Sequence, residues 1–429
     1  MIKRILLATL APLLPLIPSI VAADNDVSVL DISVDINFPV ALVFNLEAES
    51  SADIVDARLH YQVDKMNSVS VTSEGWADFS PATKIKTSWT WDMRKSSLPP
   101  GAAITYWWTI QDEAGNNLQS PPAVACFEDV RYDWQSLASA GFAQSQATFQ
   151  DNDSGLTLFW YEGDGSFATE LMQACEQGLG RLIENIGTYP EKPIKIYVYA
   201  STSDLQGAMI FPQEWTGGAA FTEFGIIAIG ISPGQLDWGK RALVHELTHL
   251  IVHQAIFSPY GELPAWLDEG LAMYNEGALA TTFEVYLQQA ISEDELISVR
   301  SLCSPFSAEP EQAYVSYAQS YSLVEYLLDS YGQARMLNLL TLLKQGNTYD
   351  EALTLVYGFD IDGLDARWHE TVTATASAAL SQGPERSEVA AKQTHPALIA
   401  VLSALATCLA LAGALALEKW DWQRAGQKG

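Results

Sequence analysis

Three residues near the middle of the chain, His245, Glu246 and His249, form the pattern His-Glu-x-x-His. On an α-helix, two histidines four residues apart project from the same face, about 6 Å apart along the axis, so both imidazoles can bind one metal ion. Glu246 lies roughly 100° further round such a helix, which suits a base beside the ion better than a ligand. The neighbouring residues are mostly apolar, as expected for a helix in the centre of a domain.

A third ligand has to come from elsewhere, because a catalytic zinc site usually combines three protein ligands with one water. A second apolar segment, separated from the first by a Ser-Pro-Tyr-Gly break, carries the adjacent carboxylates Asp268 and Glu269. A helical hairpin can bring either carboxylate back to the ion, and spacing alone does not choose between them. His253 follows His249 on the first helix, but helical rise places it about 12 Å from His245, too far to share one ion without a break in the helix.

The second segment completes a wider pattern. Nineteen residues lie between His249 and Glu269, and this glutamate belongs to the run Trp-Leu-Asp-Glu-Gly-Leu-Ala. This combination resembles the gluzincin metallopeptidases, in particular the peptidase MA-like domains related to the M1 aminopeptidases. The resemblance implies a zinc ion (Zn²⁺) held by His245, His249 and Glu269, and it favours this glutamate over its neighbour Asp268. It also implies hydrolysis of peptide bonds by a metal-activated water, with Glu246 as the general base.

A further match begins at Tyr317, where Tyr-Ala-Gln-Ser resembles the Tyr-Glu-Lys-Gly helix of the M1 group. The first tyrosine of that helix steadies the oxyanion, a role that the resemblance assigns to Tyr317. The M1 exopeptidase motif Gly-x-Met-Glu-Asn has no counterpart in this sequence, so the resemblance does not extend to aminopeptidase specificity. Carboxylates usually orient metal-binding imidazoles, and Asp268 and Glu276 are the candidates for that role.

The composition limits the classes of function. The chain has 429 residues, 48% of them hydrophobic, which predicts two or three folded domains. Its 52 acidic and 23 basic residues give a formal net charge of -29, which repels nucleic acid and excludes a nucleic-acid role. Only six histidines are present, and three of them fall within nine positions, which indicates that this helix face serves a metal. The four cysteines do not indicate a disulfide framework: one bridge is possible and none is required.

Residues 24–129 show the period-two alternation and the turn residues typical of strands. About seven short strands in this range predict an all-β sandwich of the immunoglobulin or fibronectin type. Trp89, Trp91, Trp107 and Trp108 either form a binding patch for a sugar or protein or pack the core of the sandwich, and we expect most of them to pack the core.

Residues 130–152 form a polar connector in this interpretation, and residues 153–380 form an α+β catalytic domain. The apolar segments predict a small twisted sheet before the metal-binding helix and a mostly helical part after Tyr274. The resemblance implies a thermolysin-like fold, in which the edge strand of the sheet binds a peptide as one more strand. We place this edge strand at Gly218 to Phe221.

The N-terminal residues 1–23 have the features of a secretory signal peptide, because Lys3 and Arg4 precede an apolar run and small residues follow it. The alternative, an uncleaved anchor helix, is disfavoured by three prolines in this segment.

Near the other end, residues 397–417 are apolar almost throughout and long enough to cross a bilayer of about 30 Å. We expect one transmembrane helix here; the alternative is a buried core helix, which rarely lacks a polar face over such a length. Residues 381–396 are then a polar stalk and residues 418–429 a cytoplasmic tail. The expected location is the cell membrane, single-pass, with the N-terminal ectodomain outside.

The sequence therefore predicts a membrane-anchored, extracytoplasmic zinc peptidase that acts on a peptide or protein substrate. Two alternatives remain open. In one, the sandwich recognises a partner at the cell surface and the peptidase fold is a catalytically silent scaffold. In the other, the zinc ion only braces the fold of a structural surface protein.

Overall fold

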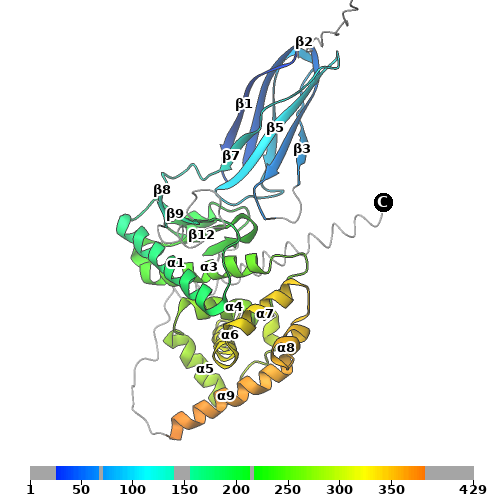
Figure 1. Ribbon diagram of the computed structural model, residues 1–429. Helices are drawn as coiled ribbons and strands as arrows, with labels where there is room; N and C mark the ends of the chain where they lie inside the picture. The colour runs from blue at the N-terminus through cyan, green and yellow to red at the C-terminus, as the bar shows by residue number, and fades with distance from the viewer. Residues whose placement is uncertain (1–25, 67–70, 140–154, 213–216, 382–429) are drawn as a thin grey trace, which may run out of the picture.

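The computed structural model describes residues 26–66, 71–139, 155–212 and 217–381. Figure 1 shows an elongated β-rich N-terminal part, then a smaller mixed sheet, and then a helical part on the far side of that sheet. This order of a β-rich region followed by mixed and then mostly helical structure agrees with the expected fold class at that level.

The N-terminal region consists of antiparallel strands. These are β1 (Ser28–Asn37), β2 (Ala41–Val63), β3 (Ser73–Trp76), β4 (Ala82–Asp92), β5 (Ala102–Asp112), β6 (Asn117–Gln119) and β7 (Ala123–Phe127). The long strand β2 changes partners along its length. The part up to Glu49 pairs with β1 and β4, Ile54 pairs with both β4 and β5, and the part from Arg58 pairs with β3 and β5. Its two halves therefore join two sets of strands, and the immunoglobulin or fibronectin assignment stays a prediction.

The tryptophans of this region mainly pack its core. Trp91 and Trp108 are buried, and Trp89 is partly buried with its ring against Trp91. Trp107 faces the other side of β5 and stacks on the His60 ring of the neighbouring strand. The prediction that most of them pack the core is confirmed.

The second sheet contains, among the described residues, β8 (Gln135–Ala138), β9 (Leu156–Trp160), β10 (Ile194–Tyr199), β11 (Gly218–Phe221) and β12 (Ile226–Gly230). Their order is β11-β12-β10-β9-β8, with parallel pairing in the middle and antiparallel pairing at both ends. β11 is therefore an edge strand at the residues where the sequence analysis placed one.

The opposite edge strand, β8, corrects one prediction. Its residues, 135–138, fall inside the segment 130–152 that the sequence analysis treats as a polar connector, yet they pair with β9. A four-residue edge strand that begins Gln-Ser carries too few apolar positions to show a period of two. Residues 140–154, which include the rest of that segment, lie outside the described residues.

The helices are α1 (Gly165–Ile186), α2 (Thr202–Gln206), α3 (Leu236–Ala255), α4 (Ala265–Glu276), α5 (Thr281–Glu293), α6 (Pro310–Tyr331), α7 (Gln333–Lys344), α8 (Tyr349–Tyr357) and α9 (Ile361–Ser381). α1 begins after Asp164, whose carboxylate accepts hydrogen bonds from two backbone N–H groups of the first turn, and it ends at Gly187 in the left-handed conformation. Gly332 and Gly358 end α6 and α8. All three glycines have a positive φ, which glycine adopts without strain.

The sheet has an apolar neighbour on each face. Alternate residues of β10 point in opposite directions, so its isoleucine and valine side chains join the helix-side core, whereas Tyr197 and Tyr199 join the core of the N-terminal region. Tyr199 Oη donates a hydrogen bond to buried Asp129 at 3.2 Å, and Lys192 Nζ lies 2.5 Å from an oxygen of Asp64. The N-terminal region and the sheet therefore share one core.

Several predicted segments lie outside the described residues: the signal peptide 1–23, the transmembrane helix 397–417, the tail 418–429 and nearly all of the stalk 381–396. Within the described ranges, none of the helices combines the length and the apolar character that a bilayer span requires.

The contact between Gly101 of the N-terminal region and Tyr197 of the sheet can be tested by mutation. Gly101 has a φ of 78°, and a β-carbon at this position would overlap the ring of Tyr197. We predict that Gly101→Ala lowers the free energy of unfolding by more than about 2 kcal/mol, because a clash between the two parts adds to the cost of left-handed backbone. Gly115→Ala is the matched control, since Gly115 has a φ of 88° but open space around it.

Urea unfolding followed by circular dichroism and tryptophan fluorescence measures both losses. Equal losses in the two variants would contradict a close contact between the N-terminal region and the sheet.

Candidate metal centre

Helix α3 positions the His-Glu-x-x-His residues in the interior of the protein. α3 packs against α1, α4 and β11, and its second half is buried on nearly all sides. His245, Glu246 and His249 are each at most 2% exposed. Polar groups that have lost water in this way must find partners or bind an ion, because burial without a partner is costly.

Helix α4 brings Glu269 to the same place. The next residue, Gly270, faces α6, where an added β-carbon would overlap the backbone carbonyl of Ser320. Only a glycine allows α4 to lie this close to α6, and this packing holds the adjacent Glu269 toward α3. Glu269 is completely buried.

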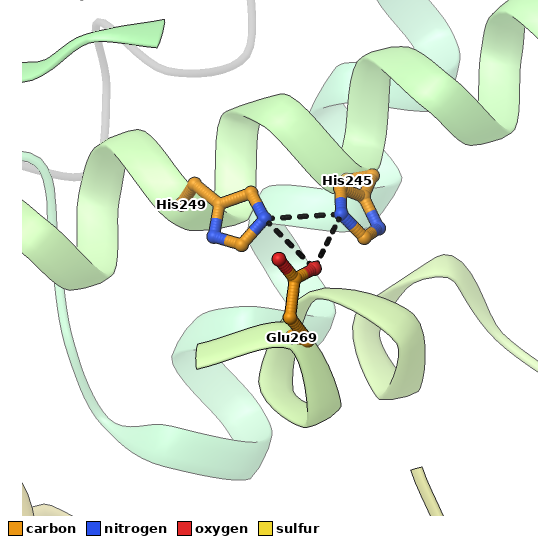
Figure 2. A group of neighbouring side chains, drawn as sticks. All are labelled: His245, His249 and Glu269. Carbon is orange, nitrogen blue, oxygen red and sulfur yellow. Dashed lines mark hydrogen bonds and ion pairs between the residues drawn. The ribbon is translucent and has the colours of Figure 1, made fainter. Parts of the chain in front are cut away.

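The three side chains converge from these two helices, as Figure 2 shows. The Nε2 atoms of His245 and His249 are 3.0 Å apart, and Oε2 of Glu269 lies 3.4 Å from the first and 3.5 Å from the second. A tetrahedral ion with bonds of about 2.0–2.2 Å holds its ligand atoms about 3.3–3.6 Å apart. The three donor atoms therefore have close to the spacing of one face of a coordination tetrahedron.

The bonding of Glu269 also fits a cation. Neither of its carboxylate oxygens has a hydrogen-bond partner of good geometry among the described residues. An ionised carboxylate in such a position carries a large desolvation penalty, which an ion bound to it removes. The same ion would satisfy the two Nε2 atoms that face each other. His245, His249 and Glu269 can thus hold a metal.

The other nitrogen of each imidazole is held by a second carboxylate. His245 Nδ1 lies 2.8 Å from Oε1 of Glu276, and His249 Nδ1 lies 2.8 Å from Oδ1 of Asp268. Because a carboxylate accepts hydrogen bonds, each Nδ1 carries a proton and a neutral ring then presents the lone pair of Nε2 to an ion. Both carboxylates are the ones that the sequence analysis considered for this role.

The surrounding charges set the protonation of the imidazoles. Burial lowers the pKa of His245, but its contacts with the carboxylates of Glu269 and Glu276 outweigh this effect and raise the pKa to about 8. Burial likewise lowers the pKa of His249, but the charge of Asp268 raises it well above its usual value. Burial raises the pKa of Glu269, and its contacts with the two imidazoles bring it below its usual value. A metal ion that binds here therefore competes with protons.

His253, which the sequence analysis set aside as a ligand of the same ion, contacts Asp268 instead. Its Nε2 lies 3.0 Å from each oxygen of that carboxylate, so Asp268 joins His249 to His253. These three residues form a second group with metal-ligand chemistry. An ion there would need the Nδ1 lone pair of His249, which is bonded to the proton donated to Asp268. The two groups compete for His249. Only the first one contains a carboxylate without a hydrogen-bond partner of good geometry among the described residues.

The contact between His253 and Asp268 is one that the sequence analysis missed. The one-turn spacing of His249 and His253 places both rings on one helix face, which is the signal that could have indicated it.

Tyr317 lies on α6, the helix that packs against α4. Its side chain is buried, and its ring packs edge-on against the rings of Phe283 and Phe306. The role in oxyanion binding that the resemblance implies for it stays a prediction.

Comparison with known proteins identifies the part of the chain that contains this site. Residues 174–374 match the family model of the Peptidase MA superfamily. The match runs from within α1 into α9 and includes both histidines, Glu246, Glu269 and Tyr317. No curated protein matches the chain.

We predict that each chain binds one divalent ion and that Glu276→Gln weakens the binding of zinc by about 10- to 100-fold, since a neutral amide holds the His245 ring less firmly. Glu170→Gln is the control, because Glu170 forms an exposed ion pair with Lys240 of the same helix α3. Competition with a chromophoric chelator measures the dissociation constant. Unchanged affinity in Glu276→Gln would show that this hydrogen bond does not serve the metal.

Proposed function

We propose that this protein is a zinc-dependent metallopeptidase of the gluzincin type, related to the M1 aminopeptidases. Zinc would be held by His245, His249 and Glu269, because two imidazoles and one carboxylate are a ligand set of catalytic zinc sites. The observation that carries the proposal is the convergence of these three buried donor atoms, 3.0–3.5 Å apart, one of them from a carboxylate that has no hydrogen-bond partner of good geometry among the described residues. The match to the Peptidase MA superfamily supports it.

When bound, zinc supplies a Lewis acid that polarises the scissile carbonyl and lowers the pKa of a water to about 7. Glu246 takes a proton from the attacking water and passes it to the leaving amine. Glu246 follows His245 in the chain, so its carboxylate lies near the site, but it is not one of the three residues that would hold the metal. Tyr317 donates a hydrogen bond to the oxyanion that develops on the carbonyl oxygen.

The substrate class that we propose is a peptide or protein segment in an extended conformation. β11 pairs with β12 on one side and, among the described residues, has no strand on the other. An extended peptide adds to such an edge through backbone hydrogen bonds, and pockets for its side chains then give selectivity.

We further propose the domain organisation and location that the sequence predicts. A signal peptide (1–23) precedes an immunoglobulin- or fibronectin-like β-sandwich domain (24–129), and the peptidase domain (153–380) is followed by a transmembrane helix (397–417). The peptidase then faces the outside of the cell membrane, with the short tail 418–429 in the cytoplasm. The apolar runs at both ends of the chain are the support for this proposal.

The alternative function is a catalytically silent surface-binding protein, in which the β-sandwich recognises a partner. A silent scaffold can keep the metal ligands because they stabilise the fold, but it has no use for a base. The burial of Glu246 beside His245 therefore favours an enzyme.

Replacement of the base separates the two functions. We predict that Glu246→Gln keeps one zinc ion per chain and lowers the rate of peptide cleavage by about 10²- to 10⁴-fold, because the amide cannot take up a proton. Digestion of an unbiased peptide library with mass-spectrometric readout, with and without a chelator, measures the cleavage. A zinc-loaded wild-type protein that cleaves nothing would support the silent scaffold.

A second variant tests the tyrosine. We predict that Tyr317→Phe lowers kcat by about a hundredfold and leaves KM and zinc content nearly unchanged, since it removes only the hydroxyl that donates to the oxyanion. Tyr314→Phe is the matched control on the same helix, because Tyr314 is also buried and stacks on Tyr286. Equal kcat values for the two variants would remove Tyr317 from the mechanism.

A further inference from the structure

The first residue of the edge strand lies directly against Glu246. A β-carbon placed on Gly218 would be 3.0 Å from Oε1, 3.2 Å from Cδ and 3.3 Å from Cγ of Glu246. Ordinary van der Waals contacts of a β-carbon are 3.4–4 Å. The three nearest atoms all belong to one side chain, so a β-carbon at position 218 would force the side chain of Glu246 to shift by a few tenths of an ångström.

The backbone does not explain the glycine at this position. Gly218 is not one of the glycines with a positive φ, so its backbone conformation is open to any L-residue. Its register in the sheet is also regular, since it pairs with Ile229 of β12 in a continuous antiparallel ladder. The side chain of Glu246 is therefore the neighbour that a side chain at position 218 would have to displace.

The alternation of β11 agrees with this placement. Phe221 packs against the core on the side of the N-terminal region, whereas Ala220 packs against the core on the side of the helices. Successive side chains of a strand point to opposite faces, so Gly218 faces the same side as Ala220, toward α3. The two positions on this face carry the two smallest residues, and the one without a side chain is the one at Glu246.

We propose that Gly218 is a positioning residue for the reaction. Because it has no β-carbon, the carboxylate of Glu246 can lie between α3 and β11 in the position from which it acts as the base. This inference rests on the proposed function, because it assigns Glu246 as the base. It goes further in one respect. β11 is the strand proposed to bind the substrate, and its first residue also contacts the side chain of Glu246. The same strand therefore positions both the substrate and the general base.

The test is Gly218→Ala in the full chain. The added methyl group displaces the carboxylate by a few tenths of an ångström or rotates it away, and a misplacement of about 1 Å costs up to about a hundredfold in rate. We expect kcat to fall by about ten- to a hundredfold, with zinc content, KM and melting temperature close to those of the wild type. Gly234→Ala is the control, since Gly234 just precedes α3, has no positive φ and has no atom within 4 Å of its β-carbon position.

A double variant keeps the test independent of other effects of the methyl group. Glu246→Asp shortens the side chain by one methylene and moves the carboxylate away from Gly218. Gly218→Ala should therefore lower kcat much less in a Glu246→Asp background than in the wild type. Equal costs in the two backgrounds would overturn the inference.

The other outcomes are also decisive. A Gly218→Ala variant with wild-type kcat, or one that loses zinc or fails to fold, overturns the inference, because the methyl group would then not act through the carboxylate. A zinc-loaded wild-type protein without peptidase activity would instead refute the proposed function itself.

Discussion

A buried carboxylate that has no hydrogen-bond partner of good geometry in the described part of the chain is the feature on which the rest of the site depends. Glu269 is held there by helix packing, because Gly270 lets α4 approach the backbone of α6 and this turns the glutamate toward α3. Leaving an ionised group unpaired in the interior is costly. The fold tolerates this cost because His245 and His249 point at the same spot and a cation can join all three groups.

The charges around this spot are arranged in two layers. The outer carboxylates, Glu276 and Asp268, each bridge an inner imidazole and an outer group, which is Arg241 for the first and His253 for the second. Each of these two carboxylates therefore has a hydrogen-bond partner on its inner side and another on its outer side. The carboxylate of Glu269 lies between the two inner imidazoles, so its negative charge is at the centre, where an ion that takes nitrogen and oxygen ligands fits.

The sequence predicts the parts of this site that depend on local geometry. A four-residue spacing on a helix is enough to pair His245 with His249, and glycines mark most helix ends. It could not choose Glu269 over Asp268 by spacing, because adjacent helical residues differ only by rotation; in the structure they contact opposite sides of the same imidazole. The closeness of Gly218 to Glu246 and the pairing of β8 with β9 arise only when distant segments meet, and no local pattern encodes them.

The N-terminal region contributes to the site through the sheet. Its core continues into Tyr197 and Tyr199 on one face of β10, while the helices cover the other face, so neither face of the sheet is open to a substrate. Backbone hydrogen-bonding groups of the described sheet are then left at its two edges. β8 lies at the far end of the strand order, whereas β11 begins beside Glu246. For the proposed peptide substrate, β11 is then the edge of the described sheet that lies beside the candidate metal centre, because the faces of the sheet are covered.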